Sequence, residues 1–377
     1  MGFWSPQRQK SGGSVLAVAL DGDTLNFLVF RQMADKKQVL KYGNQQVTAG
    51  GLQESLGQVI AQLPREVSVG TLIATFSPDH FKAKSIEIVF PGRGARHVLD
   101  KKEALWIEKT MRQQAKAKLF GNLFGESGIL PADFRMLRLV PTSQKIDGYS
   151  VPRLEGFKAG EIRASFLATF LLATTFFDLA EFVESKKLHT VRVRHMAEAI
   201  ADFGRKTSRE GVYLYVGRRH SQLVVWKQGV LLLPETSLAL GEEDFVEVFG
   251  EVLGMRDNIA FEFEKRYVEG ALSTQVKEKI DSLLLPTFQK FVTLIKKQLE
   301  VMKTPLPGNI WIFGRGIKTH HFQEVLQAQL AKGLPFTEDI NVHILAPKDI
   351  WEGVSFAQNH NPQYSSLCLV ADSVLVA

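Results

Sequence analysis

The sequence predicts an α/β protein with two lobes, and three observations support this prediction. Residues 211–245 contain three strand-length runs of β-branched, aromatic or aliphatic residues, separated by short polar turns. These runs span residues 212–216, 223–226 and 230–233. A similar strand, turn and strand occur at residues 14–30, and amphipathic helical segments alternate with the strands. A chain of 377 residues with 45% hydrophobic content is long enough to bury a large core, in two domains or in one domain with insertions.

The composition excludes several classes of site. The net charge of +6 and the isoelectric point near 9.2 favour acidic partners such as phospholipid, nucleotide or an acidic tail, although basic and acidic residues are interspersed. No interleaving of aromatic and basic residues points to nucleic acid. Cys368 is the only cysteine, which excludes an internal disulfide, and its apolar neighbours predict that it is buried.

The ends and the apolar stretches of the sequence bear on its location. Residues 1–13 are basic and rich in Gly and Ser, and we expect them to form a flexible tail and not a signal peptide. The longest nearly unbroken apolar stretch, at 164–177, is shorter than the roughly 20 residues that a bilayer span needs. We therefore expect a cytoplasmic protein.

The first lobe is expected to begin with a β-hairpin. Its elements are strands at 14–20, 25–30, around 39–42 and at 67–76, and an amphipathic helix at 51–63. The first turn is Asp21-Gly22-Asp23-Thr24, a sequence that is also common in structural hairpins. Residues 83–169 then form a candidate insertion. It contains strands at 85–90, 135–140 and 161–169, turns at 92–94 and 146–149, and a polar amphipathic helix at 101–120.

The remaining elements alternate in the same way. They are a core helix at 170–184, a short strand at 189–193, helices from 194, at 245–253 and at 258–267, a long amphipathic stretch at 273–302 with Pro286 inside it, and a closing helix at 362–376. A strand at 309–313 runs into Gly314-Arg315-Gly316 at a helix start, which directs backbone N–H groups toward an anion or a base. His195 fits either a polar nucleotide-site residue or a solvated histidine at a helix start.

Taken in order, these motifs resemble the actin-like ATPase fold, a duplicated ribonuclease-H-like α/β fold. Within it, the sequence is most similar to the bacterial cell-division family FtsA. The stretches 136–141, 145–149 and 156–162 resemble the small α+β insertion subdomain of that family. The related pilus-assembly family PilM also carries an insertion at this place, so it remains the competing assignment.

The resemblance implies a division into parts. It places a first actin-like lobe at residues 14–82 and 170–210, closed by a helix within 355–377. The FtsA-type insertion subdomain would span 83–169, and the second lobe would span 211–354.

The resemblance also implies a nucleotide site for ATP or ADP, with Mg²⁺ near Asp21 and no assigned catalytic residue. The residues that match the family positions are Asp21, Asp23, Thr24, Gly217, Arg218, Arg219, Gln222, Gly241, Glu262, Lys265, Arg266, Gly314, Arg315 and Gly316. For Glu262, Lys265 and Arg266, an exposed salt-bridged helix face explains the pattern equally well.

Several of these residues depart from the family pattern. Tyr215 stands where an Asp is expected, Arg218 and Arg219 replace glycines, and Gln222 replaces a second Asp. Phosphoryl transfer needs Mg²⁺ held by carboxylates and close approach of glycine backbone. The departures therefore predict weak or absent ATP hydrolysis, with any bound nucleotide acting as a structural ligand.

Two functions follow from the resemblance, and a third is disfavoured. The first is an FtsA-like cytoskeletal scaffold of cell division, whose partners would be a tubulin-like division protein and other divisome components. Such a scaffold would self-associate into filaments and reach the membrane indirectly. The alternative is a PilM-like cytoplasmic platform for type IV pili, which would bind a bitopic pilus protein. A sugar or acetate kinase would need a catalytic Asp and a substrate domain, and the sequence shows neither.

Overall fold

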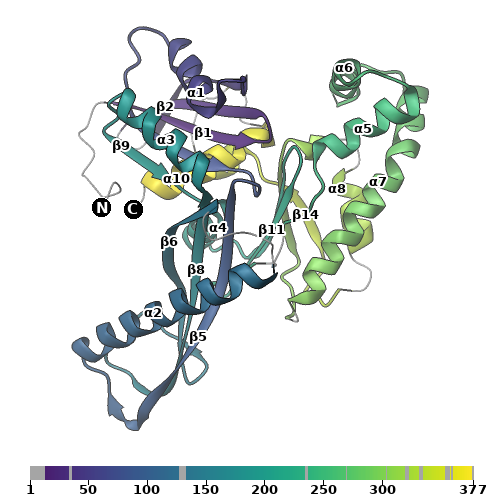
Figure 1. The fold of residues 1–377 in the computed structure, drawn as a ribbon. Coiled ribbons are helices and arrows are strands. Elements are labelled where there is room, and N and C mark those ends of the chain that lie inside the picture. Colours follow the sequence, from purple (N-terminus) through teal and green to yellow (C-terminus); the bar gives the residue numbers. More distant parts are fainter. Residues whose placement is uncertain are drawn as a thin grey trace.

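The protein consists of two lobes, each built on a five-stranded mixed sheet, and a long arm that extends from the first lobe (Figure 1). The computed structural model describes residues 13–33, 36–126, 133–233, 237–268, 270–302, 304–318, 322–330, 334–352, 357 and 360–375. The predicted tail at 1–13 therefore lies almost wholly outside the described residues.

The first lobe has the strand order β3-β2-β1-β4-β9. Its strands are β1 (Ser14–Asp21), β2 (Thr24–Met33), β3 (Lys36–Gln46), β4 (Val69–Phe76) and β9 (Thr190–Val193), and its helices are α1 (Gly51–Ala61), α3 (Ala173–Ser185), α4 (Met196–Thr207) and α10 (Ser365–Leu375). Every residue of β1 is buried, because this strand lies at the centre of the sheet with helices on both faces.

The second lobe repeats the arrangement, with the order β12-β11-β10-β13-β14. Its strands are β10 (Gly211–Val216), β11 (Ser221–Lys227), β12 (Val230–Leu232), β13 (Asn309–Gly314) and β14 (Asn341–Ile344). Its helical elements are α5 (Glu242–Leu253), α6 (Asp257–Val268), α7 (Thr274–Val301), η2 (Gly316–Lys318), α8 (Phe322–Leu330) and α9 (Pro347–Ile350). The short η3 (Pro362–Tyr364) leads into α10, and its Gln363 donates to Asn26 of the first lobe at 2.9 Å. In both lobes an antiparallel meander of three strands is extended by two parallel strands. The predicted duplication is confirmed.

The helices α4 and α10 join the two lobes. Their apolar side chains share one core with inward-facing residues of β1 and of β10, including Ala17, Tyr213 and the predicted buried thiol Cys368. The outer faces of the two sheets have separate cores, under α1 and α3 in the first lobe and under α5, α7 and α8 in the second. No helix within the described ranges is both long and apolar enough to cross a bilayer.

The predicted insertion is confirmed as an antiparallel sheet with the order β5-β8-β6-β7 and one covering helix. Its elements are β5 (Phe81–Val98), α2 (Lys101–Glu126), β6 (Phe134–Ile146), β7 (Tyr149–Ser150) and β8 (Lys158–Leu172). The prediction of a turn at 92–94 was wrong, because shifts in the pairing register between Pro91, Gly94 and Val98 let β5 continue opposite β8. The turn after Ile146 is correct, with Asp147 and Gly148 both at positive φ.

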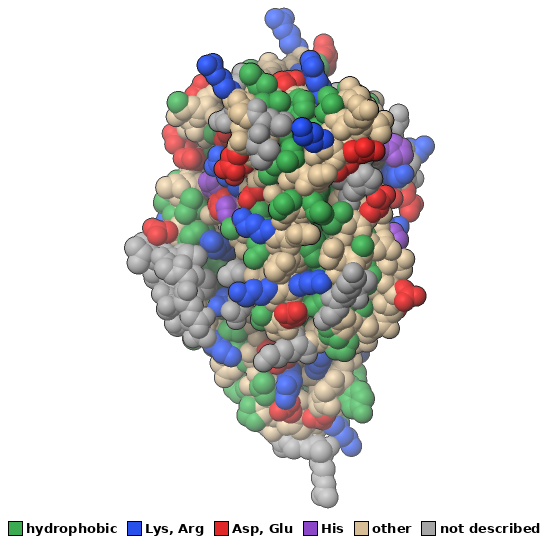
Figure 2. Space-filling model, turned by 90° about the vertical axis from the view of Figure 1, so that its right-hand side faces the viewer, with side chains coloured by type: hydrophobic (Ala, Val, Ile, Leu, Met, Phe, Trp, Pro, Cys, Tyr) green, Lys and Arg blue, Asp and Glu red, His purple; other side chains and the backbone are tan. Residues whose placement is uncertain are grey.

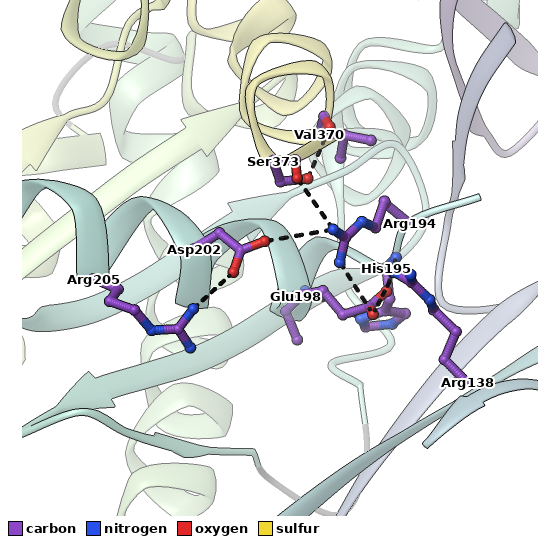
Figure 3. A network of polar contacts seen from close by, with 9 residues as sticks. Arg138, Arg194, His195, Glu198, Asp202, Arg205, Val370 and Ser373 are labelled. Carbon is purple, nitrogen blue, oxygen red and sulfur yellow. Dashed lines mark hydrogen bonds and ion pairs between the residues drawn. The ribbon is translucent and has the colours of Figure 1, made fainter. Parts of the chain in front are cut away.

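A polar network fixes the base of the arm to the first lobe (Figure 3). Glu198, on α4, is almost fully buried and lies 3.3 Å from Arg138 on β6 and 3.4 Å from Arg194 at the start of α4. The Arg194 guanidinium also donates to the backbone carbonyl of Ser373 on α10, at 3.1 Å. Glu198 thus connects the insertion to α4 directly, and Arg194 extends the network to α10.

Replacing Glu198 with alanine would leave two partly buried guanidinium groups without their common carboxylate. We expect Glu198→Ala to lower the free energy of unfolding by about 3 kcal/mol, as is usual when one partner of a buried ion pair is removed. Urea unfolding followed by circular dichroism measures this change. Glu181→Ala, on the exposed face of α3, is the control and should change the value by no more than about 0.5 kcal/mol. Equal effects of the two substitutions would contradict the role given to Glu198.

Candidate functional site

The turns of the two lobes' first hairpins touch directly. Both carboxylate oxygens of Asp21, at the end of β1, accept the backbone N–H of Arg218 in the β10–β11 turn, at 3.0 and 2.9 Å. A Cβ atom added to Gly217 would lie 2.9 Å from Asp21 Oδ1, so only glycine allows this approach. The two turns to which the resemblance assigns nucleotide-binding residues therefore contact each other.

Three further glycines bring other segments to the same point. A Cβ atom on Gly314, at the end of β13, would lie 2.2 Å from the carbonyl oxygen of Val216, and Gly314 has a φ of 111°. A Cβ on Gly316 would lie 2.5 Å from Val216 Cγ1, and one on Gly241 would lie 2.4 Å from the Arg218 carbonyl oxygen. The structure thus brings Asp21, Gly217 and Gly314 close together between the two lobes.

Tyr215 occupies the position where the family pattern has an acid, and it binds Asp21. Its hydroxyl donates to Asp21 Oδ2 at 2.8 Å, and both side chains are buried. Burial raises the pKa of Asp21 above its ordinary value, while the N–H of Arg218 and the Tyr215 hydroxyl oppose that rise. Burial and the neighbouring Asp21 also raise the pKa of Tyr215. The Asp21 oxygens are thus held by protein donors.

The side chain of Arg218 covers the turn of the first hairpin. Its Nη1 donates to Thr24 Oγ1 at 2.8 Å and also to the Asp23 carboxylate. Its Nε lies 2.8 Å from Glu243 Oε1, and the side chain as a whole is nearly buried. A Cβ on Gly22 would lie 3.5 Å from Arg218 Cδ, so the arginine stem packs over this glycine. The Arg218 side chain therefore packs over the Asp21–Thr24 turn.

Two further arginines beside this contact also form ion pairs with carboxylates. Arg219 Nε lies 2.9 Å from Glu243 Oε2, and Arg315 Nε, from the G-R-G motif, lies 2.9 Å from Glu242 Oε2. Glu242 and Glu243 form the first turn of α5, where the helix dipole favours negative charge. The arginines are therefore neutralised by neighbouring protein groups.

These contacts do not fit the phosphates of a bound nucleotide. A phosphate cradle presents free N–H groups and hydroxyls, whereas here the Arg218 N–H is bonded to Asp21 and the Thr24 hydroxyl is bonded to Arg218. A metal site needs several acidic or imidazole ligands together, and no such group of three occurs in the portion of the chain that the structure describes.

The other predicted site residues lie on β11 and on α6. Gln222, on β11, is the cross-strand partner of Tyr215, and its amide lies 3.3 Å from Nε2 of His195. Glu262 and Arg266 are exposed on α6, which lies beside α5 at the outer end of the second lobe (Figure 1). The side chain of Lys265 is outside the described residues. The exposure of Glu262 and Arg266 is what the alternative of an exposed helix face predicts, and the assignment of the α6 residues to a nucleotide stays a prediction.

His195 has a structural role that the sequence did not indicate. It is almost fully buried, and its Nδ1 accepts the backbone N–H of Ala197 as the cap of α4. Its Nε2 lies 3.2 Å from the carbonyl oxygen of Phe81. Burial lowers the pKa of His195 to about 4, which keeps the ring neutral at physiological pH. The expectation of a solvated histidine was wrong.

The topology of the two sheets and the insertion is that of the actin-like ATPase fold, and comparison with solved structures agrees. The chain is similar to the structure of the PilM–PilN complex of type IV pilus biogenesis, with 15% identity, 96% of this chain and 98% of that chain covered, and a TM-score of 0.65. It is less similar to the ethanolamine utilization protein EutJ from Carboxydothermus hydrogenoformans, with 11% identity, coverage of 98% and 91%, and a TM-score of 0.49. No protein-family model matches the sequence, and no curated protein does either.

The contact between His220 and Asp79 predicts a pH dependence of stability. His220 Nδ1, in the second lobe, lies 2.9 Å from Asp79 Oδ2, in the loop between β4 and β5. The hydrogen bond to Asp79 raises the pKa of His220, and the same bond lowers the pKa of Asp79. A histidine whose folded pKa is raised stabilises the fold fully below its unfolded pKa of about 6.5, and this contribution disappears as pH rises through the folded value.

We expect His220→Gln to destabilise the protein by less than about 1 kcal/mol at pH 6, since the pair is partly exposed, and to have a smaller effect at pH 8.5. Urea unfolding at a series of pH values measures the difference. The control is His189→Gln at an exposed position. If His220→Gln destabilised the protein more as pH rises, the predicted direction of the pH dependence would be wrong.

Proposed function

We propose that this chain is a PilM-like platform protein that binds the cytoplasmic segment of a bitopic membrane protein in a pilus-type assembly, without hydrolysing ATP. The observation that carries the proposal is the Arg218 side chain, which covers the Gly22 turn and binds Thr24. The cleft of the actin-like fold then serves as a rigid joint between the lobes.

The chemistry of the cleft supports a scaffold and not a phosphohydrolase. Hydrolysis of a γ-phosphoryl group depends on positioning by metal and backbone donors. The Asp21 side chain already accepts hydrogen bonds from the Tyr215 hydroxyl and the Arg218 N–H. Arg315 is already paired with Glu242. Opening the site would break several buried charge-assisted hydrogen bonds at once, which is costly in a region of low dielectric.

The likeness to PilM favours the pilus alternative over a role in cell division. The insertion was the sequence feature that favoured FtsA, but the likeness to PilM covers 96% of this chain and therefore includes the insertion. The structure that carries this likeness is a complex of PilM with PilN, which suggests a partner of the same kind here. No feature of the described residues adds support for a tubulin-like partner.

The proposal predicts binding to a short peptide. A peptide copied from the cytoplasmic N-terminus of a bitopic pilus protein of the same organism should bind the full chain with a Kd in the range of about 1–100 μM, measured by fluorescence anisotropy. Its affinity should be the same with and without ATP and Mg²⁺, because the cleft is already closed. A scrambled peptide is the control. Binding of a tubulin-like division protein in place of the pilus peptide would overturn the assignment.

A further inference from the structure

The helix α2 of the insertion has two contrasting faces. On one side, small and aliphatic residues pack onto β5 and β8. These buried residues are Ala104, Ile107, Met111, Ala115 and Leu119. Their spacing of three and four residues leaves the opposite face of the helix to solvent, along one side of the arm (Figure 1).

The exposed side of α2 is strongly basic. Residues 101–119 contain six basic and two acidic residues. The basic ones are Lys101, Lys102, Lys109, Arg112, Lys116 and Lys118, and all six are exposed. The two acids already have partners, because Glu103 binds His97 and Glu108 accepts the Gln144 amide at 3.2 Å. The helix therefore carries a surplus of positive charge on its outer face.

Two large apolar side chains lie within this basic face. Leu105 is 57% exposed and Trp106 is 52% exposed. They are one turn from Lys102 and Lys109, so cations surround them on the helix surface. The Trp106 ring packs edge-on against Phe90, with the centroids 5.7 Å apart, which holds the indole in place. Figure 2 shows a contrasting face, on which basic, acidic and apolar side chains are interspersed.

We propose that the exposed face of α2 binds the surface of a membrane that contains anionic lipid. Five of the six cations are lysines, whose compact charges suit a diffuse layer of phosphates, whereas recognition of a particular carboxylate favours arginine. Trp and Leu suit the interfacial region of a bilayer, where an amphipathic helix lies flat with its apolar side chains below the headgroups. This inference does not depend on the identity of the pilus-type partner.

Vesicle sedimentation tests the proposal. The full chain should bind phosphatidylcholine vesicles that contain about 30 mol% phosphatidylglycerol, should not bind pure phosphatidylcholine, and should lose binding at about 0.5 M salt. The triple variant Lys102→Gln, Lys109→Gln and Arg112→Gln should reduce the partition coefficient roughly a hundred-fold, because each surface cation contributes about fivefold. Brominated lipid should quench tryptophan fluorescence in the wild type and should quench it much less in Trp106→Phe.

A matched variant distinguishes the site from overall charge. Lys279→Gln, Lys290→Gln and Lys297→Gln remove three exposed cations from α7 and should leave vesicle binding nearly unchanged. Equal loss in the two triple variants would overturn the proposal, as would equal binding to neutral vesicles. Binding of a polyglutamate peptide through the α2 lysines, with no binding to vesicles, would also overturn it and would indicate an acidic protein partner.

Discussion

The arrangement of the two lobes depends on the hydrogen bonds between Asp21 and the turn that contains Arg218. A carboxyl group in a buried position is stable only when hydrogen-bonding groups satisfy its oxygens. Here the donors come from the opposite lobe, as the Arg218 N–H and the Tyr215 hydroxyl. In turn, the guanidinium of Arg218 donates a hydrogen bond to Thr24 in the first lobe. Each lobe thus satisfies a buried polar group of the other.

The same physical arrangement recurs at the base of the arm. Glu198 is a second buried carboxylate, and its donors come from the insertion and from the start of its own helix. Both sites use one acid to hold segments that are distant in the sequence. These contacts hold the two lobes and the base of the arm together.

The repeated sheets could be predicted from the sequence because their strands are local runs of β-branched and aromatic residues. The meeting of Asp21, Gly217 and Gly314 could also be predicted, since it follows from the order of the motifs in the fold. The direction of the Arg218 side chain could not be predicted from the sequence. A guanidinium beside a glycine-poor loop could extend toward a ligand, and its actual course depends on Thr24 and Asp23, almost 200 residues earlier in the chain.

Two other errors have the same origin. His195 follows Arg194 at the predicted start of a helix, so its sequence suggests solvent exposure, yet packing against Phe81 buries it. The Gly92–Gly94 segment suggests a turn, yet pairing with β8 carries the strand through it. In each case a contact with a distant segment overrides a local preference.

Isothermal titration calorimetry with ATP, in the presence and absence of Mg²⁺, tests most directly whether Arg218 has taken the place of a phosphate. If the arginine and its carboxylate partners fill the cleft, neither titration of the wild-type chain will give saturable heat. Saturable binding with a Kd below about 100 μM would show that the cleft opens to a nucleotide. That result would contradict the closed joint described for the two lobes.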